Sequence, residues 1–177
     1  MDMEKEKLFE QNQRRPHRLL VRHLRRSLFT PKRVGVMPLM AKAAAMSGAV
    51  GIRANTVRDH TPRSNRSVDL PVIGHHQKGL PRPPPCTFTV TMKEVDELVA
   101  CGVDILAVQG TGALRPDGST SAQFIRAIKA KYPDQLLMAD CDNFENAMLC
   151  AEAGADFVGT TMRGYTPETQ GINDIGF

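Results

Sequence analysis

The chain has 177 residues, of which 41% are hydrophobic, and its formal net charge is +4. This length and composition predict one globular domain with a sizeable core. The sequence has no apolar run near the roughly 18 to 20 residues that span a bilayer, and its N-terminus does not resemble a signal peptide. We therefore expect a cytoplasmic protein without a membrane partner. The four cysteines form no CxxC pair, which is typical of reduced thiols, and we expect no metal site.

The positive charge is concentrated at the N-terminus. Residues 1–35 contain ten Lys/Arg and four Asp/Glu, whereas the remaining 142 residues contain thirteen and fifteen. Such a basic segment weakly suggests nucleic-acid binding. A solvated tail explains it better, because the segment has no recognisable nucleic-acid motif. We expect residues 1–33 to be a basic arm, residues 34–177 to be the folded domain, and nucleic acid not to be a partner.

Four helices are predicted along the chain. An Ala-rich helix follows Met37 and ends at Gly48, since glycine commonly ends helices. Thr91 and Glu94 form a capping box that opens a second helix. A third helix begins at Ser119 or Thr120 and ends before Pro133. The fourth is expected to begin at Asp142, which is followed three residues later by a glutamate.

Short apolar runs between these helices predict buried strands. They lie near residues 49–54, 70–74, 104–109, 136–140 and 156–161.

Three of the strands directly follow a helix-ending glycine. These glycines are Gly48, Gly102 and Gly154, separated by 54 and 52 residues. Each separation equals about two strand–helix units, which predicts a parallel α/β fold. The spacing does not decide between a barrel and a doubly wound sheet. No GxGxxG follows a strand, which counts against a dinucleotide-binding fold.

Several segments together resemble the N-acetylmannosamine-6-phosphate 2-epimerase family. The most specific are SGAVGIRAN at 47–55 and GADFVGTTMRGYTP at 154–167; VDLPVIG, TMKEVDELVACGVDILA, RPDG and LLMAD lie between them in the family's order. The resemblance covers residues 34–168, with breaks near 60–67 and 75–89. It implies a (β/α) TIM-type barrel that interconverts N-acetylmannosamine 6-phosphate and N-acetylglucosamine 6-phosphate. The implied partner is an amino-sugar phosphate, and proton transfer at carbon 2 needs no cofactor.

The chain departs from the family pattern at both ends. The family has a different first strand, and after GYTP it has two more strand–helix units with the catalytic glutamate and the phosphate loops. We therefore expect a barrel that is incomplete at the C-terminus.

One loop also departs from the family, whose lysine base follows the LPVIG strand in a GIIK-like sequence. Here the segment reads GHHQK, which places Gln77 at the lysine position and Lys78 one residue later. Glutamine has no basic nitrogen, and a shift of one residue along a strand reverses the direction of the side chain. Lys78 is the candidate catalytic residue, with a solvated surface lysine as the alternative. His75 and His76 are expected to be a loop pair without a catalytic role.

Arg53 and Asp140 are the candidate substrate-binding residues. Each ends a predicted strand at the rim where barrel active sites form, and each matches a site residue of the family. The alternatives are a structural ion pair for Arg53 and a helix-capping role for Asp140. We expect both to face one cavity together with Gln109, which replaces an aspartate of the family. Further candidates are less specific: Thr160 and Thr161 could bind substrate or only form the strand, and Arg115 is expected to be a loop residue.

Two functions therefore remain open. One is an epimerase of impaired activity, and the other is an inactive remnant or non-enzymatic binding module of the same origin. The sequence does not determine the oligomeric state.

Overall fold

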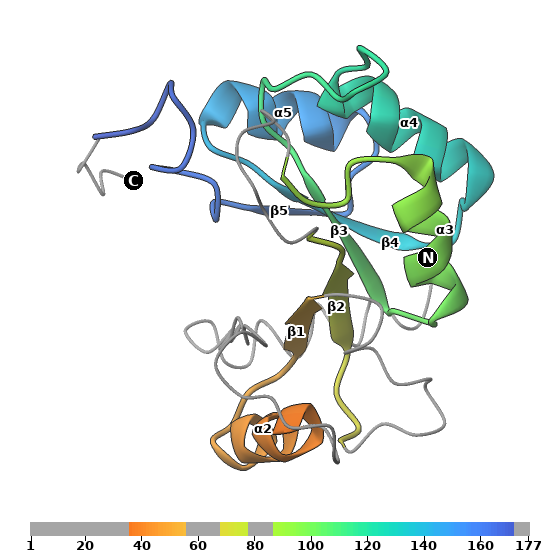
Figure 1. Ribbon diagram of the computed structural model, residues 1–177, viewed down its shortest axis with the longest axis vertical. Coiled ribbons are helices and arrows are strands. Elements are labelled where there is room, and N and C mark those ends of the chain that lie inside the picture. Colours follow the sequence, from red (N-terminus) through yellow and green to blue (C-terminus); the bar gives the residue numbers. More distant parts are fainter. Residues whose placement is uncertain (1–35, 56–67, 78–86, 172–177) are drawn as a thin grey trace.

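The computed structural model describes residues 36–55, 68–77 and 87–171, which form a five-stranded sheet covered by helices (Figure 1). Neighbouring strands are all parallel, and their order follows the chain. The expected strands and their parallel arrangement are confirmed, although the last strand ends at residue 159 and not at 161. The strands are β1 (Ile52–Asn55), β2 (Val72–His75), β3 (Ile105–Gln109), β4 (Leu136–Asp140) and β5 (Phe157–Gly159). The predicted basic arm at 1–33 and the candidate base Lys78 lie outside the described residues.

The four predicted helices are present in the expected order. They are α2 (Val36–Met46), α3 (Met92–Ala100), α4 (Ser121–Lys131) and α5 (Phe144–Glu152). The glycines that end α2, α3 and α5 have φ angles of 86°, 70° and 108°, so each takes the left-handed conformation that glycine adopts without steric cost.

The starts of the helices follow local hydrogen bonding. The Glu94 carboxylate accepts from the Thr91 N–H at 2.9 Å, as the capping box predicts. Thr120 is the N-cap of α4, and its hydroxyl accepts from the Gln123 N–H at 3.3 Å. The expected start of α5 at Asp142 is wrong by one residue. Asn143 is the N-cap and accepts from the Asn146 N–H at 2.8 Å, whereas the Asp142 carboxylate accepts from the Asn146 side chain.

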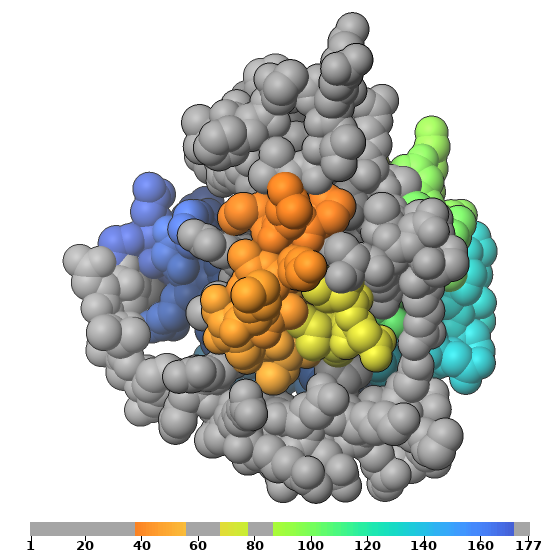
Figure 2. Space-filling model, turned by 90° about the horizontal axis from the view of Figure 1, so that it is seen from below, coloured from red at the N-terminus to blue at the C-terminus, as the bar shows by residue number. Residues whose placement is uncertain are grey.

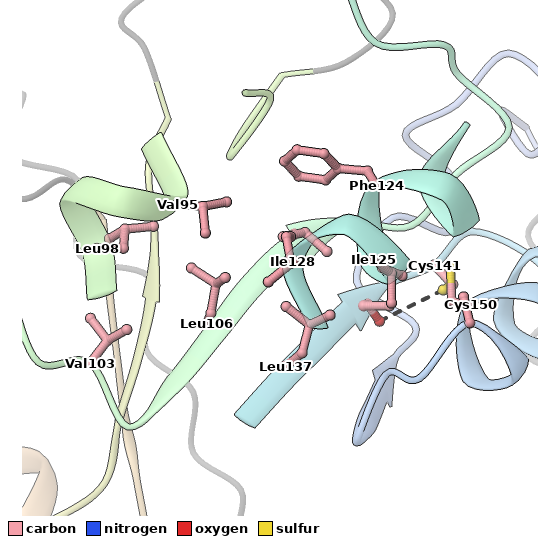
Figure 3. Close-up of a cluster of buried hydrophobic side chains, with 13 residues drawn as sticks. Val95, Leu98, Val103, Leu106, Phe124, Ile125, Ile128, Leu137, Cys141 and Cys150 are labelled. Atoms are coloured by element: carbon pink, nitrogen blue, oxygen red, sulfur yellow. Dashed lines mark hydrogen bonds between the residues drawn. The ribbon is translucent and has the colours of Figure 1, made fainter. Parts of the chain in front are cut away.

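One face of the sheet is covered by α3, α4 and α5. Alternate strand residues point toward this face, because successive side chains of a strand project to opposite sides. They pack with apolar side chains of the three helices into the largest buried cluster (Figure 3). The strand residues in this cluster are Leu106, Val108, Leu137 and Ala139, and the main helix residues are Val95, Leu98, Phe124, Ile125 and Ile128.

The opposite face, here called the inner face, has its own smaller apolar cluster. It contains Ile73, Ile105, Ala107, Leu136 and Met138, with Phe157 packed against it. The strand order is sequential, and α3, α4 and α5 lie on the same side of the sheet (Figure 1). A doubly wound sheet reverses its strand order at a switch point and has helices on both faces. The described residues therefore have the arrangement of consecutive units of a (β/α) barrel, which confirms the predicted fold class.

The first helix packs near β1, away from the main core. Ala44 of α2 is buried with Ala49 and Ile52, and Val68 and Leu70 pack against them. Figure 2 shows α2 at the surface beside the segment that contains β2. Among the described helices, none has the length and apolarity that a membrane crossing requires.

Gly110 follows β3 at a point where the backbone passes two buried thiols. A Cβ at this position would lie 2.8 Å from the Cys141 sulfur and 3.1 Å from both the Cys150 sulfur and the Ala139 Cβ. Real Cβ atoms are almost never this close to a neighbour, so any side chain at residue 110 would force the strand or the thiols to move.

We predict that Gly110→Ala destabilises the fold by about 1–3 kcal/mol through overpacking. Removing the nearest sulfur in Gly110→Ala/Cys141→Ala should give a loss smaller than the sum of the single losses, because the two sites share one contact. Gly112→Ala is the control, since its added Cβ would meet nothing nearer than an Asn146 nitrogen at 3.8 Å. Urea unfolding measures the free energies, and equal losses at residues 110 and 112 would contradict the packing described here.

Candidate functional site

The strand ends place a group of polar side chains on the inner face. Asn55, His75, Gln109 and Asp140 are the last residues of β1, β2, β3 and β4. Asn55 is the register partner of His75, and Gln109 is the register partner of Asp140. Successive residues of a strand face opposite sides of the sheet, and by this alternation each of the four faces the same side as the inner apolar cluster. The C-terminal ends of parallel strands are where active sites form in (β/α) barrels.

Arg53 and Asp140 form a buried ion pair across this face. The Arg53 Nη1 donates to Asp140 Oδ1 at 2.9 Å, and its Nη2 donates to Oδ2, so the pair is bidentate. The side chains are 3% and 0% exposed. The two candidate substrate-binding residues are therefore in direct contact, and the alternative of a structural ion pair for Arg53 describes the same contact. The Arg53 Nε is also buried and has no hydrogen-bond partner among the described residues.

Two neighbours shape the surroundings of this pair. Gly159 of β5 lies beside Asp140, and a Cβ there would come within 3.0 Å of Asp140 Oδ1, so glycine leaves room for the carboxylate. Phe88 lies on the side of the guanidinium, with the Arg53 Cζ 5.9 Å from the ring centroid. The same ring meets the imidazole of His75 edge-on at 5.5 Å. His75 is thus buried against an aromatic ring, although it was expected in a loop.

Gln109 lies on the inner face as expected, but its side chain is occupied by the protein. Its Oε1 accepts from the Thr87 N–H at 2.8 Å and from the Thr87 hydroxyl at 3.1 Å. Its Nε2 donates to the Thr111 hydroxyl at 2.9 Å. The amide therefore connects three segments of the chain, and a direct contact with substrate would have to compete with these bonds.

Gln77, which the sequence places at the family's lysine position, lies close to β1. Its N–H donates to Asn55 Oδ1 at 3.0 Å, and the Asn55 side-chain nitrogen donates to Gln77 Oε1 at 3.4 Å. The rim position predicted for a base is thus occupied by a neutral amide. The role of Lys78 as the base stays a prediction, because Lys78 lies outside the described residues.

Three polar residues after β4 were not predicted as neighbours. The Asp142 carboxylate accepts from the Thr166 hydroxyl at 2.9 Å, and the Thr166 and Thr169 hydroxyls are 2.8 Å apart. These side chains are buried and join the loop after β5 to the start of α5. By contrast, the candidate residues Thr160 and Thr161 are exposed and lie beyond the end of β5. Thr166 belongs to the GADFVGTTMRGYTP segment, but that pattern does not indicate its contact with Asp142, which lies 24 residues earlier in the chain.

Arg115 is a buried loop residue with a structural role, as expected from the sequence. Its Nη2 donates to the Gln109 carbonyl at 3.0 Å, and its Cζ lies 4.0 Å from the centroid of the Phe124 ring. Within the described ranges, no group of three or more His, Cys, Asp or Glu side chains is arranged to hold a metal ion.

Two thiols lie behind the rim, on the helix side of the sheet. Hydrogen bonding with Cys150 and burial raise the pKa of Cys141. The same hydrogen bond lowers the pKa of Cys150, and the positive charge of Arg115 acts in the same direction. Both side chains belong to the main core cluster, so these thiols are separated from the polar groups of the inner face by the sheet.

Comparisons with known proteins agree with the fold. Residues 37–177 match the family model described as "Putative N-acetylmannosamine-6-phosphate epimerase". The chain is 45% identical over 148 residues to a Borrelia garinii protein named "Putative N-acetylmannosamine-6-phosphate 2-epimerase", with 80% of this chain and 62% of the relative covered. A Pediococcus pentosaceus protein of the same name is 43% identical over 138 residues, covering 78% of this chain and 59% of the relative.

A solved structure is also similar. It is that of the N-acetylmannosamine-6-phosphate 2-epimerase from Clostridium perfringens, with a TM-score of 0.67 and 35% identity. The match covers 77% of this chain and 58% of that one. The chain thus spans about three fifths of the length of the proteins that it matches.

We predict that breaking the Arg53–Asp140 pair is costly. Asp140→Ala should destabilise the fold by about 3–5 kcal/mol, because it leaves a buried guanidinium without its counter-charge. The double variant Arg53→Met/Asp140→Leu should recover most of this loss, since apolar residues of similar volume can replace a buried ion pair.

Urea unfolding of these two variants and of one control variant measures the change in the free energy of unfolding. Asp96→Ala is the control, because Asp96 pairs with Lys131 at 2.7 Å but both side chains are largely exposed. The loss at residue 96 should be much smaller, since solvent screens the exposed pair. A loss at Asp140 no larger than that at Asp96 would show that the buried pair does not form.

Proposed function

Since the chain belongs to the N-acetylmannosamine-6-phosphate epimerase family, we propose that it acts on carbon 2 of N-acetylmannosamine 6-phosphate and converts it to the N-acetylglucosamine epimer. The reaction removes a carbon-bound proton next to a carbonyl and returns one to the other face. It needs a base, an acid and groups that stabilise the enolate-like intermediate. The substrate is an amino-sugar phosphate, and proton transfer alone requires no cofactor.

The observation that carries this proposal is the buried Arg53–Asp140 pair on the inner face, which lies at the end of β4. A guanidinium has five N–H donors in a fixed plane, and Asp140 accepts from two of its nitrogens. The unpartnered Nε of Arg53 is a buried donor on the face where a substrate oxygen would bind. Leaving a buried donor unpaired is costly, so a ligand that accepts from it gains affinity. We assign Arg53 to a substrate oxygen and Asp140 to the orientation of Arg53 and of a substrate hydroxyl.

The base is the part of the site that differs most from the family pattern. Lys78 lies one residue from the lysine position of the family, and we propose it as the base of a slow reaction. Gln77 contributes only a neutral amide, which is bonded to Asn55. A positioned base typically contributes about 10²- to 10⁴-fold, so its displacement should reduce the rate by a large factor.

The Gln77–Asn55 contact also favours a second candidate function. A protein with Arg53 and Asp140 in place, but with an amide at the base position, could bind the sugar phosphate without converting it. The two candidates make different predictions for exchange at carbon 2, although both require binding.

We predict slow uptake of solvent deuterium at carbon 2 when the chain is mixed with N-acetylmannosamine 6-phosphate in deuterated water. Gln77→Lys should accelerate the uptake by roughly 10²- to 10⁴-fold, because it places an amine at the rim position beside Asn55. Lys78→Ala should abolish the slow uptake of the unmodified chain. Proton NMR of the substrate signal measures all three rates.

Lys93→Ala is the matched control, because Lys93 is an exposed residue of α3 and should not affect uptake. Binding of the sugar phosphate without any exchange, in the unmodified chain and in Gln77→Lys, would select the binding module. If neither binding nor exchange occurs, the proposed function is wrong. Uptake at the rate of the Borrelia garinii relative would instead contradict the impaired base.

A further inference from the structure

A short strained segment lies against the end of β2. Thr89 is buried and has a φ of 44°, which a β-branched residue rarely adopts. Its N–H donates to the His76 carbonyl at 2.7 Å, and its hydroxyl accepts from the His76 N–H at 3.1 Å. Phe88 also forms an antiparallel bridge with Gln77. Strain of this kind persists only where surrounding contacts enforce it, and it is concentrated at functional sites.

The Gln109 amide holds the start of this segment. Thr87 donates to it twice, through its N–H and through its hydroxyl. Gln109 is only 1% exposed and is bonded to Thr111 at its other end, so the amide cannot turn away without losing bonds. Residues 87–90 are thus fixed to the end of β3 as well as to the end of β2.

The fixed segment places Phe88 between two groups of the inner face. Its ring meets the Arg53 guanidinium at 5.9 Å and the His75 imidazole at 5.5 Å. Arg53 is therefore bonded to Asp140 through its two Nη atoms and has the Phe88 ring beside it. A guanidinium held in this way keeps its Nε–H, one of the donors that Asp140 does not use, in one direction.

We propose that Gln109 and Phe88 are positioning residues: Gln109 fixes the segment at 87–90, and Phe88 fixes the direction of the Arg53 donor. The consequence for substrate rests on the proposed function, in which Arg53 binds the sugar phosphate. In this chain, an amide fits the contacts of residue 109 better than a carboxylate for two reasons. A carboxylate there could not donate to Thr111, and it would add a second negative charge beside Asp140, its register partner, and compete for Arg53.

The Nε–H signal of Arg53 in a proton–nitrogen correlation spectrum tests the positioning without any substrate. The signal is identified by its loss in Arg53→Lys. Phe88→Leu should shift it and accelerate its exchange with water by at least about tenfold, because the ring no longer confines the guanidinium. Gln109→Glu should act in the same direction while leaving the ring and the core in place, so it keeps the test valid if Phe88→Leu folds poorly.

Phe124→Leu is the control, because Phe124 is a phenylalanine beside a different arginine, Arg115, whose Cζ lies 4.0 Å from the ring centroid. It should change the Arg115 signal and leave the Arg53 signal unchanged. An Arg53 signal that is unaffected by Gln109→Glu in a folded protein would overturn the proposal.

Titration with N-acetylglucosamine 6-phosphate then separates this proposal from the proposed function. If both hold, the Arg53 signal moves on binding, and Phe88→Leu and Gln109→Glu each weaken binding by at least about tenfold, which corresponds to roughly 1.4 kcal/mol. If the unmodified chain does not bind the sugar phosphate, the proposed function fails, whereas the substrate-free Arg53 signal still decides the positioning roles.

Discussion

The contact between Arg53 and Asp140 requires the sheet to curve. Arg53 pairs in register with Ile73 of β2, which pairs with Ile105 of β3, which in turn pairs with Leu136 of β4. Asp140 lies four residues beyond Leu136 along β4. In a flat sheet, three strand spacings and four residues would separate the two backbones by about 14 Å sideways and about 13 Å lengthwise. The two side chains together could not close such a diagonal. Twist and curvature toward the inner face bring them together, and the same curvature forms a barrel.

The curvature also determines which side chains are available for chemistry. Strand residues alternate between the helix side, where they build the main core, and the inner face. Asp140 and Cys141 are neighbours in the chain, yet the carboxylate meets Arg53 while the thiol belongs to the core beside Cys150. The core and the proposed substrate contact therefore involve adjacent residues that point to opposite sides of the sheet. The rim can differ between relatives without disturbing the helix layer.

Much of the fold could be predicted because its signals are local. The glycines at 48, 102 and 154 each end a helix with a positive φ, and their spacing revealed the strand–helix unit. Apolar runs predicted the strands, of which β3 and β4 are buried on both faces. The start of α5 was misplaced because two candidate caps are adjacent, and the choice depends on a distant group. Asp142 bonds to Thr166, 24 residues later, and this leaves Asn143 as the cap.

The candidate site was only partly predictable, for a related reason. Arg53 and Asp140 could be predicted to lie together because both were expected at the ends of regular strands, which meet at one rim of a parallel sheet. In the structure Asp140 does end β4, whereas Arg53 is the second residue of β1 and its side chain reaches Asp140 across the inner face. Phe88 and Thr89 belong to an irregular segment without a motif, so nothing in the sequence indicated that they approach β2 or that Gln109 is occupied by Thr87.

Strand alternation links the rim to the question of the base. Ile73 and His75 of β2 have inner-face positions, and Gln77, two residues further on, makes its contact with Asn55 on the same side. An amine at residue 77 would therefore point where the substrate is expected. A lysine at residue 78 would point to the opposite side if the alternation continued, so it reaches the substrate side only if the backbone there departs from the strand conformation. In the proposed function, the base at this rim thus depends on a single position, while Arg53 and Asp140 contact each other on the same face of the sheet.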